Sequence, residues 1–183
     1  MARGSSPSVT WWAALLALAS VAAVGEPPPI LIDNGILTVS YDVDLDAFTI
    51  AHGGRVFAEG ERFGAGSGIE VKVIEIDDAM GRGKAIEERD AMGISVWLAL
   101  YDTLPFVCVR TALTNNWDTP FEINELEPVA VRVDLGAEPE MLRVLGCDGL
   151  TPATEERTSY TFLAVAHPET RAGVVCGWLT QER

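Results

Sequence analysis

The sequence predicts an all-β fold, an antiparallel β-sandwich, on three observations. Apolar and polar residues alternate in short runs. This period of two residues is typical of a strand with one buried and one exposed face. Turn-forming residues separate these runs at nearly regular distances, as in sandwiches and barrels. Beyond the N-terminal segment, no window combines a sustained 3.6-residue apolar stripe with helix caps.

The first predicted strands form hairpins. Residues 36–41 and 46–51 both alternate with period two. Gly53 and Gly54 then reverse the chain into a strand over 55–58, because glycine adopts the positive φ that a two-residue hairpin turn requires.

The next segment predicts a loop, a strand and a second loop. Residues 60–68 contain four glycines and indicate a loop. Residues 69–76 start with apolar side chains on one face and end with them on the other, which predicts a bulge near Val73. Residues 81–89 are polar and interrupted by glycine, and they predict a loop or hairpin tip.

The remaining elements are also extended. Residues 94–101 and 106–113 are predicted strands, joined by a turn over 102–105, and the Asn-rich residues 115–118 form a second turn. Residues 121–133 are expected to be extended, with Pro128 at an edge or bend. The last predicted strands are residues 141–145, 160–166 and 173–180.

Length and charge narrow the function classes. The 183 residues suffice for one domain with a sizeable core, but not for a sandwich followed by a barrel. The formal charge of −14 repels phosphate backbones, so no nucleic acid partner is expected. A neutral ligand such as a sugar is compatible with this charge, although solubility alone also explains it.

The N-terminal segment predicts export. Arg3 is followed by an apolar run over 11–24, in which Ser20 is the polar exception, and small residues then precede Glu26. As a helix this run spans about 21 Å, which is short of the roughly 30 Å hydrocarbon core. We therefore predict a signal peptide over 1–25, a mature domain over 26–183, secreted or periplasmic location and no stable membrane span. An uncleaved anchor is the alternative.

No metal site or cofactor is predicted. Residues 42–46 resemble the start of a calcium loop, but Ala47 and Gly53 occupy positions that need glycine and glutamate, so an acidic turn is expected. Three cysteines, too far apart in sequence for a zinc site, allow one disulfide plus a free thiol or three buried thiols. They are Cys108, Cys147 and Cys176.

No catalytic residue is predicted. Acidic residues that could share a face are expected to be solvated, because same-face acidic groups usually lie on the surface. They are Glu87, Glu88 and Asp90 in the predicted polar loop, Glu125 with Glu127, and Glu138 with Glu140. His52 and His167 lie in turn-like contexts without a neighbouring nucleophile motif.

Four strings carry a family resemblance. They are Gly81-Arg-Gly-Lys-Ala85, Leu100-Tyr-Asp-Thr-Leu-Pro-Phe-Val-Cys-Val-Arg110, Leu113-Thr-Asn115 and Gly173-Val-Val-Cys-Gly-Trp-Leu-Thr180. With them, the chain from about Gly35 onward resembles the N-terminal, supersandwich-like domain of bacterial alpha-galactosidases of the melibiase kind. In that family a (β/α) barrel follows the sandwich and carries the two catalytic aspartates.

The resemblance implies a non-catalytic role. The barrel is absent from this sequence, so the chain is expected to pack against a C-terminal barrel that binds and hydrolyses alpha-galactosides. The final strand leads into polar residues, whereas a sandwich closes its sheets before it ends. We therefore expect a sandwich that is incomplete at its C-terminus, although residues 180–183 as an ordinary frayed tail are the alternative.

Tryptophans are the remaining candidates for sugar contact, because pyranose rings stack on indole. Trp97 belongs to a core-like alternation and is expected to pack. Trp117, in a turn, and Trp178, in the last strand, are the candidate substrate-binding residues, with interface or core packing as the alternative. A stand-alone carbohydrate-binding or structural sandwich, and a mutarotase-like enzyme using His52 or His167, are the competing functions.

Overall fold

The computed structural model describes residues 28–61, 70–91, 93–116, 118–120, 122, 129–156 and 158–179. Regular structure within these ranges is extended, apart from one 3₁₀ turn, η1, over Pro139–Met141. The predicted all-β, antiparallel class is confirmed. Within these ranges no helix has the length and apolar character needed to cross a membrane.

The strands form three antiparallel sheets. The first sheet has the order β1 (Ile30–Asp33), β2 (Leu37–Asp42), β3 (Ala47–His52), β4 (Arg55–Glu61) and β9 (Val131–Val133). The second sheet has the order β5 (Glu70–Asp78), β6 (Gly81–Arg89), β7 (Ile94–Tyr101) and β8 (Val107–Leu113). The third sheet has the order β11 (Gly149–Pro152), β10 (Arg143–Gly146), β12 (Phe162–Ala166) and β13 (Gly173–Gly177).

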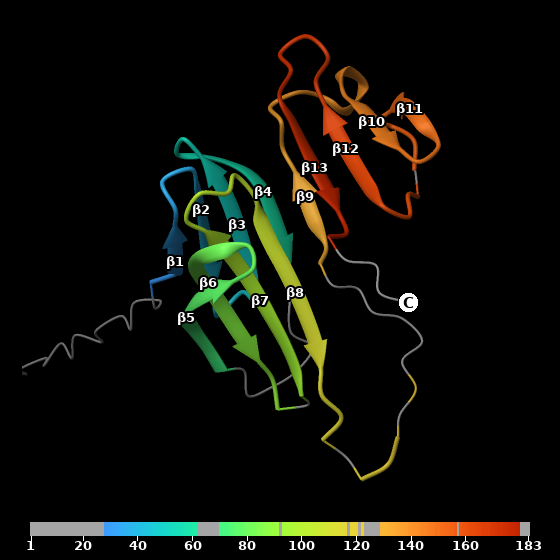
Figure 1. Cartoon of the computed structure of the whole chain (residues 1–183). Coiled ribbons are helices and arrows are strands. Elements are labelled where there is room, and N and C mark those ends of the chain that lie inside the picture. Colours follow the sequence, from blue (N-terminus) through green and yellow to red (C-terminus); the bar gives the residue numbers. More distant parts are fainter. Residues whose placement is uncertain are drawn as a thin grey trace, which may run out of the picture.

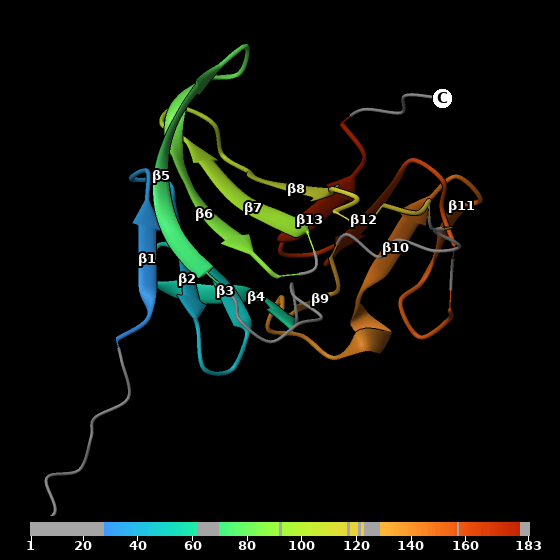
Figure 2. The same cartoon turned by 90° about the horizontal axis from the view of Figure 1, so that it is seen from below.

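The main core lies between the first two sheets. The curved second sheet covers the first, as Figure 2 shows. Side chains of alternate residues on facing strands fill the space between them, as expected for a sandwich. Its fully buried members are Ile32, Leu37, Val39, Tyr41 and Phe48 from the first sheet, with Ile86, Leu98 and Leu100 from the second. The third sheet lies beyond β9, at the side of this sandwich (Figures 1 and 2).

Most predicted strands and turns are found close to their expected positions. The acidic segment after β2 is a turn, in which Asp42 Oδ1 accepts the backbone N–H groups of Asp44 and Leu45 at 3.0 Å each. The turn after β7 is held from the first sheet, because Asn34 Nδ2 donates to the Tyr101 carbonyl oxygen at 2.7 Å. Strands β1 and β11 were not predicted. The predicted signal peptide and most of residues 121–128 lie outside the described residues.

The prediction of a loop over residues 81–89 is wrong. These residues form β6, which pairs with both β5 and β7 and is therefore a central strand. The sequence does not indicate this strand because it contains two glycines and two consecutive glutamates, and both residue types are depleted in strands. Gly83 fits because the backbone of Leu100 and Tyr101 passes where its Cβ would be, and both glutamates find partners inside the protein.

The predicted bulge near Val73 is also wrong. The β5–β6 register runs without a break from Glu70 opposite Arg89 to Asp78 opposite Gly81. The apolar side chains change face because β5 contributes to two clusters. Val71 packs against the main core, whereas Ile74 and Ile76 pack on the outer face of the sheet. An irregularity does occur in the first sheet, between Ile50 and Ala51.

Candidate interaction surface

The third sheet exposes a continuous apolar row on one face. Its register places Leu150, Leu145, Ala164 and Val175 side by side across all four strands. Leu150 is 67% exposed and Val175 is 70% exposed. Phe162 lies two residues from Ala164 on the same face and is also exposed. We call this set of five side chains the apolar face.

The described residues of the third sheet form no fully buried core of their own. The row on its opposite face consists of Thr151, Val144, Val165 and Val174, and each of these is half-buried. Within the strands of this sheet, every described side chain keeps some exposure. A sheet normally buries one face against another layer. The apolar face is therefore the part of the described chain that is best suited to meet a partner.

The candidate tryptophans are placed differently. Trp178 follows β13 directly and is 59% exposed, and its backbone N–H donates to the Thr161 carbonyl oxygen at 3.0 Å. Trp117 lies outside the described residues. Trp97 packs on the outer face of the second sheet, as expected. Its indole N–H donates to Glu87 at 3.0 Å, and the Arg110 guanidinium lies 5.2 Å from its ring centroid.

The expectation that Glu87, Glu88 and Asp90 are solvated is wrong, because all three are buried. Glu87 lies on the outer face of β6, where Lys72 Nζ and Arg89 Nη2 approach its carboxylate at 2.9 and 3.2 Å. The hydrogen bond from Lys72 is the main reason that the pKa of Glu87 lies below its ordinary value. Lys72 is directly opposite Glu87 in the register, and this cross-strand pairing is the signal that sequence reasoning missed.

Glu88 points to the opposite face of β6, into the sandwich. Its Oε2 lies 3.1 Å from the Tyr41 hydroxyl, which is also 3.0 Å from Asp46 Oδ1. Burial, followed by repulsion from Asp46, raises the pKa of Glu88 to about 7. Glu88 is 4% exposed as a residue, so a sugar ring has no approach to it. Glu138 and Glu140 are exposed near η1, and Glu125 and Glu127 lie outside the described residues.

The cysteines match neither predicted arrangement. All three thiols are free, and Cys147 and Cys176 are exposed. Hydrogen bonds from Ser159 at 3.1 Å and with Thr161 at 3.3 Å lower the pKa of Cys147 to about 7.

Within the described ranges, no three acidic, histidine or cysteine side chains lie closely enough together to hold a metal ion.

Neither histidine faces a carboxylate across a cleft in the described contacts. His167 is buried in the turn after β12, where its Nδ1 accepts the backbone N–H groups of Glu169 and Thr170 at 3.2 and 3.3 Å. His52 is exposed at the end of β3. The role of His167 is therefore to close a turn, because its Nδ1 lone pair already accepts these two groups.

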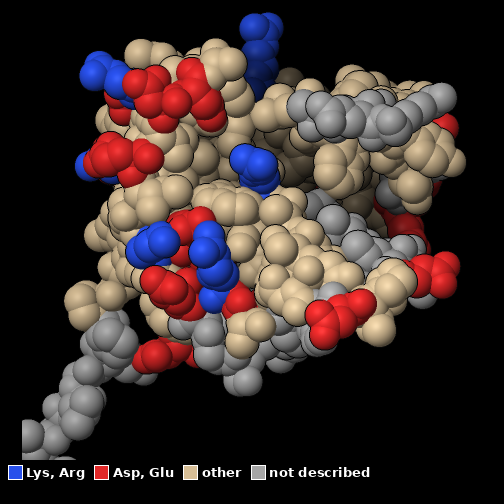
Figure 3. All heavy atoms as spheres, turned by 60° about the horizontal axis from the view of Figure 1, so that its bottom comes forward, with Lys and Arg blue, Asp and Glu red and all other residues tan. Residues whose placement is uncertain are grey.

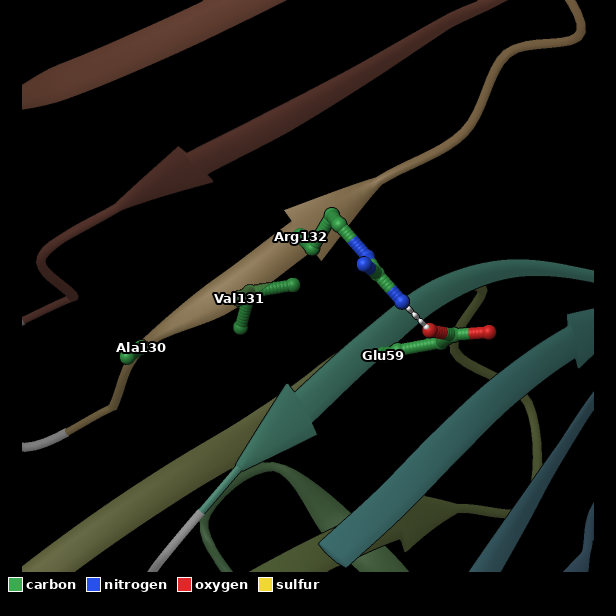
Figure 4. A pocket seen from close by; sticks show the side chains of 4 residues that line it. All are labelled: Glu59, Ala130, Val131 and Arg132. Carbon is green, nitrogen blue, oxygen red and sulfur yellow. Dashed lines mark hydrogen bonds and ion pairs between the residues drawn. The ribbon is translucent and has the colours of Figure 1, made fainter.

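A hollow of about 320 Å³ lies where β9 meets β4. Glu59, Ala130, Val131 and Arg132 line it, and an ion pair between Arg132 and Glu59 spans it, as Figure 4 shows. Exposed pairs of this kind contribute about 0–1 kcal/mol. Among the described residues that line the hollow, none is an aromatic on which a sugar ring could stack.

Charge is unevenly distributed over the face of the molecule that Figure 3 shows. In the view of Figure 3, acidic and basic side chains gather in small groups, and wide areas between them carry neither sign.

The described chain is an all-β protein of three antiparallel sheets with an exposed apolar face on the third. No family model matches it, and no curated protein or solved structure matches it significantly. The resemblance to alpha-galactosidases stays a prediction.

Proposed function

We propose that this chain is the non-catalytic N-terminal domain of a secreted or periplasmic alpha-galactosidase-like glycoside hydrolase. In this proposal the apolar face of the third sheet packs against a barrel that hydrolyses alpha-galactosides. The observation that carries the proposal is the apolar row from Leu150 to Val175, whose two end residues are exposed, on a sheet in which no described strand residue is fully buried. Contiguous apolar surface of this kind marks a contact with another protein surface.

The arrangement of the carboxyl groups favours a structural role for this chain rather than a catalytic one. Retaining hydrolysis needs two carboxyl groups about 5–5.5 Å apart with a sugar between them. Glu87 and Glu88 are adjacent on β6 and therefore face opposite sides of the sheet. Each is buried and held by partners inside the protein, so neither is available to a substrate.

The contact is tested in the complete reading frame that contains this chain, where a barrel encoded after Arg183 is expected. Leu150→Lys combined with Val175→Lys places two charges on the apolar face. We expect this variant to lose alpha-galactosidase activity on heating at a temperature at least several degrees lower than the wild type. In the isolated chain the same changes should alter the free energy of unfolding by less than about 0.5 kcal/mol each, as at other surface sites.

Leu31→Lys is the matched control, because Leu31 is a leucine of similar exposure, 60%, on the first sheet. It should leave the activity, and the temperature at which heating abolishes it, unchanged. A reading frame without a barrel, or equal effects of both variants, would overturn the proposal. Release of galactose from a chromogenic alpha-galactoside by the isolated chain would also do so.

A stand-alone carbohydrate-binding sandwich is the second candidate, and the exposure of Trp178 favours it. On this alternative, calorimetry of the isolated chain with alpha-galactosides gives saturable heat that Trp178→Ala removes. An indole that stacks on a sugar contributes roughly 1 kcal/mol or more, comparable to other aromatic contacts. We expect no saturable heat, because the proposed role of this region is to contact a barrel.

A further inference from the structure

One hydroxyl group bridges two carboxyl groups inside the sandwich. The Tyr41 hydroxyl oxygen lies 3.0 Å from Asp46 Oδ1 and 3.1 Å from Glu88 Oε2, so both are at hydrogen-bond distance. Tyr41 belongs to β2 of the first sheet and Glu88 to β6 of the second. The contact therefore joins the two sheets directly, and both side chains are almost inaccessible to water.

If both carboxyl groups are ionised, only one proton is available for the two contacts of the Tyr41 hydroxyl group. A tyrosine hydroxyl has one proton to donate, and an ionised carboxylate only accepts. With two carboxylates, one of the two contacts would bring two oxygen atoms together without a proton between them. A buried contact of that kind is costly. One more proton, held by a carboxyl group, turns both contacts into hydrogen bonds.

The surroundings assign this second proton to Glu88. From the turn after β2 it faces Asp46, from the end of β6 it faces Asp90, and both are acidic. Its cross-strand neighbours, Val71 on β5 and Val96 on β7, carry no charge. Lys72 and Arg89, which lie next to Val71 and Glu88 along β5 and β6, bind Glu87 on the opposite face. Glu88 is also the more deeply buried of the two carboxyl groups that contact Tyr41, since Asp46 is half-buried.

We propose that Glu88 is protonated in the folded protein and donates to Tyr41, which donates to Asp46, so that this proton holds the two sheets together. The link makes the sandwich sensitive to pH in the neutral range. It is independent of the proposed association with a barrel. It also differs from the usual case, in which buried carboxylates destabilise a protein when acid protonates them.

The direction of the pH dependence follows from proton binding. The pKa of Glu88 rises from its ordinary value of 4.5 to about 7 in the folded chain. Below about pH 4.5 both states hold the proton, and the stabilisation is complete. Between these values the unfolded chain has lost the proton while the folded chain retains it. The unfolding equilibrium constant therefore rises by up to about tenfold per pH unit, and this contribution becomes level above pH 7.

The test compares urea unfolding of the isolated chain at pH values from 5 to 8. The wild-type midpoint should fall over this range. Glu88→Gln should remove most of that fall, because its amide donates to Tyr41 at every pH and carries no charge. Glu75→Gln is the control, since Glu75 is an exposed carboxylate on the neighbouring strand. It should keep the wild-type dependence.

A second measurement does not depend on how the variants fold. A ¹³C NMR titration of the side-chain carboxyl groups in the wild-type chain, with Glu88 assigned, should give an apparent pKa near 7. A Glu88 midpoint near the ordinary value overturns the proposal. A wild-type pH dependence that persists unchanged in a folded Glu88→Gln variant overturns it as well.

Discussion

Phe48→Ala is expected to lower the free energy of unfolding by about 3–5 kcal/mol, as is usual for a large aromatic side chain deleted from a core. Phe48 is completely buried in the main core between the first and second sheets. Chemical denaturation of the isolated chain measures this change. A loss below about 1 kcal/mol would mean that the two sheets do not pack around this ring.

The same ring explains why residue 60 is glycine. Phe48 and Gly60 are cross-strand partners, and a Cβ at position 60 would overlap the ring atoms Cε1 and Cζ. Gly60→Ala should therefore cost about 1–3 kcal/mol in the wild-type chain. In the Phe48→Ala background this cost should vanish, since the ring is gone. A double-mutant cycle measures the coupling, and additive effects would contradict the contact between the ring and residue 60.

Gly83→Ala is expected to lower the free energy of unfolding by about 3 kcal/mol, at the upper end of the usual cost of overpacking. The added Cβ would overlap the Leu100 carbonyl oxygen and lie 2.7 Å from Tyr101 Cα. These are backbone atoms of β7, so no side-chain rotation can relieve the overlap. The β6–β7 pairing would have to separate instead, and urea unfolding would report the loss.

Gly146→Ala is the matched control for this substitution. It adds the same methyl group to a strand, but its nearest neighbours are side-chain atoms of Leu163 and Ser159 at 3.2 Å, which can move. We expect a change of less than about 1 kcal/mol. Similar losses for both variants would show that the effect of Gly83→Ala is a general property of glycine in these strands.

The fold class could be predicted because local signals agree with it. Gly53 and Gly54 reverse the chain between β3 and β4, and both adopt positive φ, as the sequence indicates. The failure at β6 has a physical cause. In a sequence alone, glutamates indicate a surface, but Glu87 and Glu88 are buried with partners that include Lys72 and Tyr41 from other strands. Sequence spacing does not bring Lys72 or Tyr41 next to them.

The candidate surface could be predicted only in part. Trp178, a candidate sugar-binding residue from its place in the last predicted strand, is exposed, but it is not one of the five residues of the apolar face. The apolar row depends on the register, which joins Leu145, Leu150, Ala164 and Val175 from four strands. In the sequence each of these residues belongs to an ordinary strand pattern. Their position side by side is a property of the assembled sheet, and among the described residues no second layer buries this row.

The position of β9 has a consequence for the order in which the chain folds. Residues 131–133 pair with β4 along Ala58, Glu59 and Gly60, which are more than 70 residues earlier in the chain. In a folding intermediate in which β9 has not yet docked, the edge of β4 is open to pairing with another chain. Slow docking of β9 would prolong that exposure and favour aggregation.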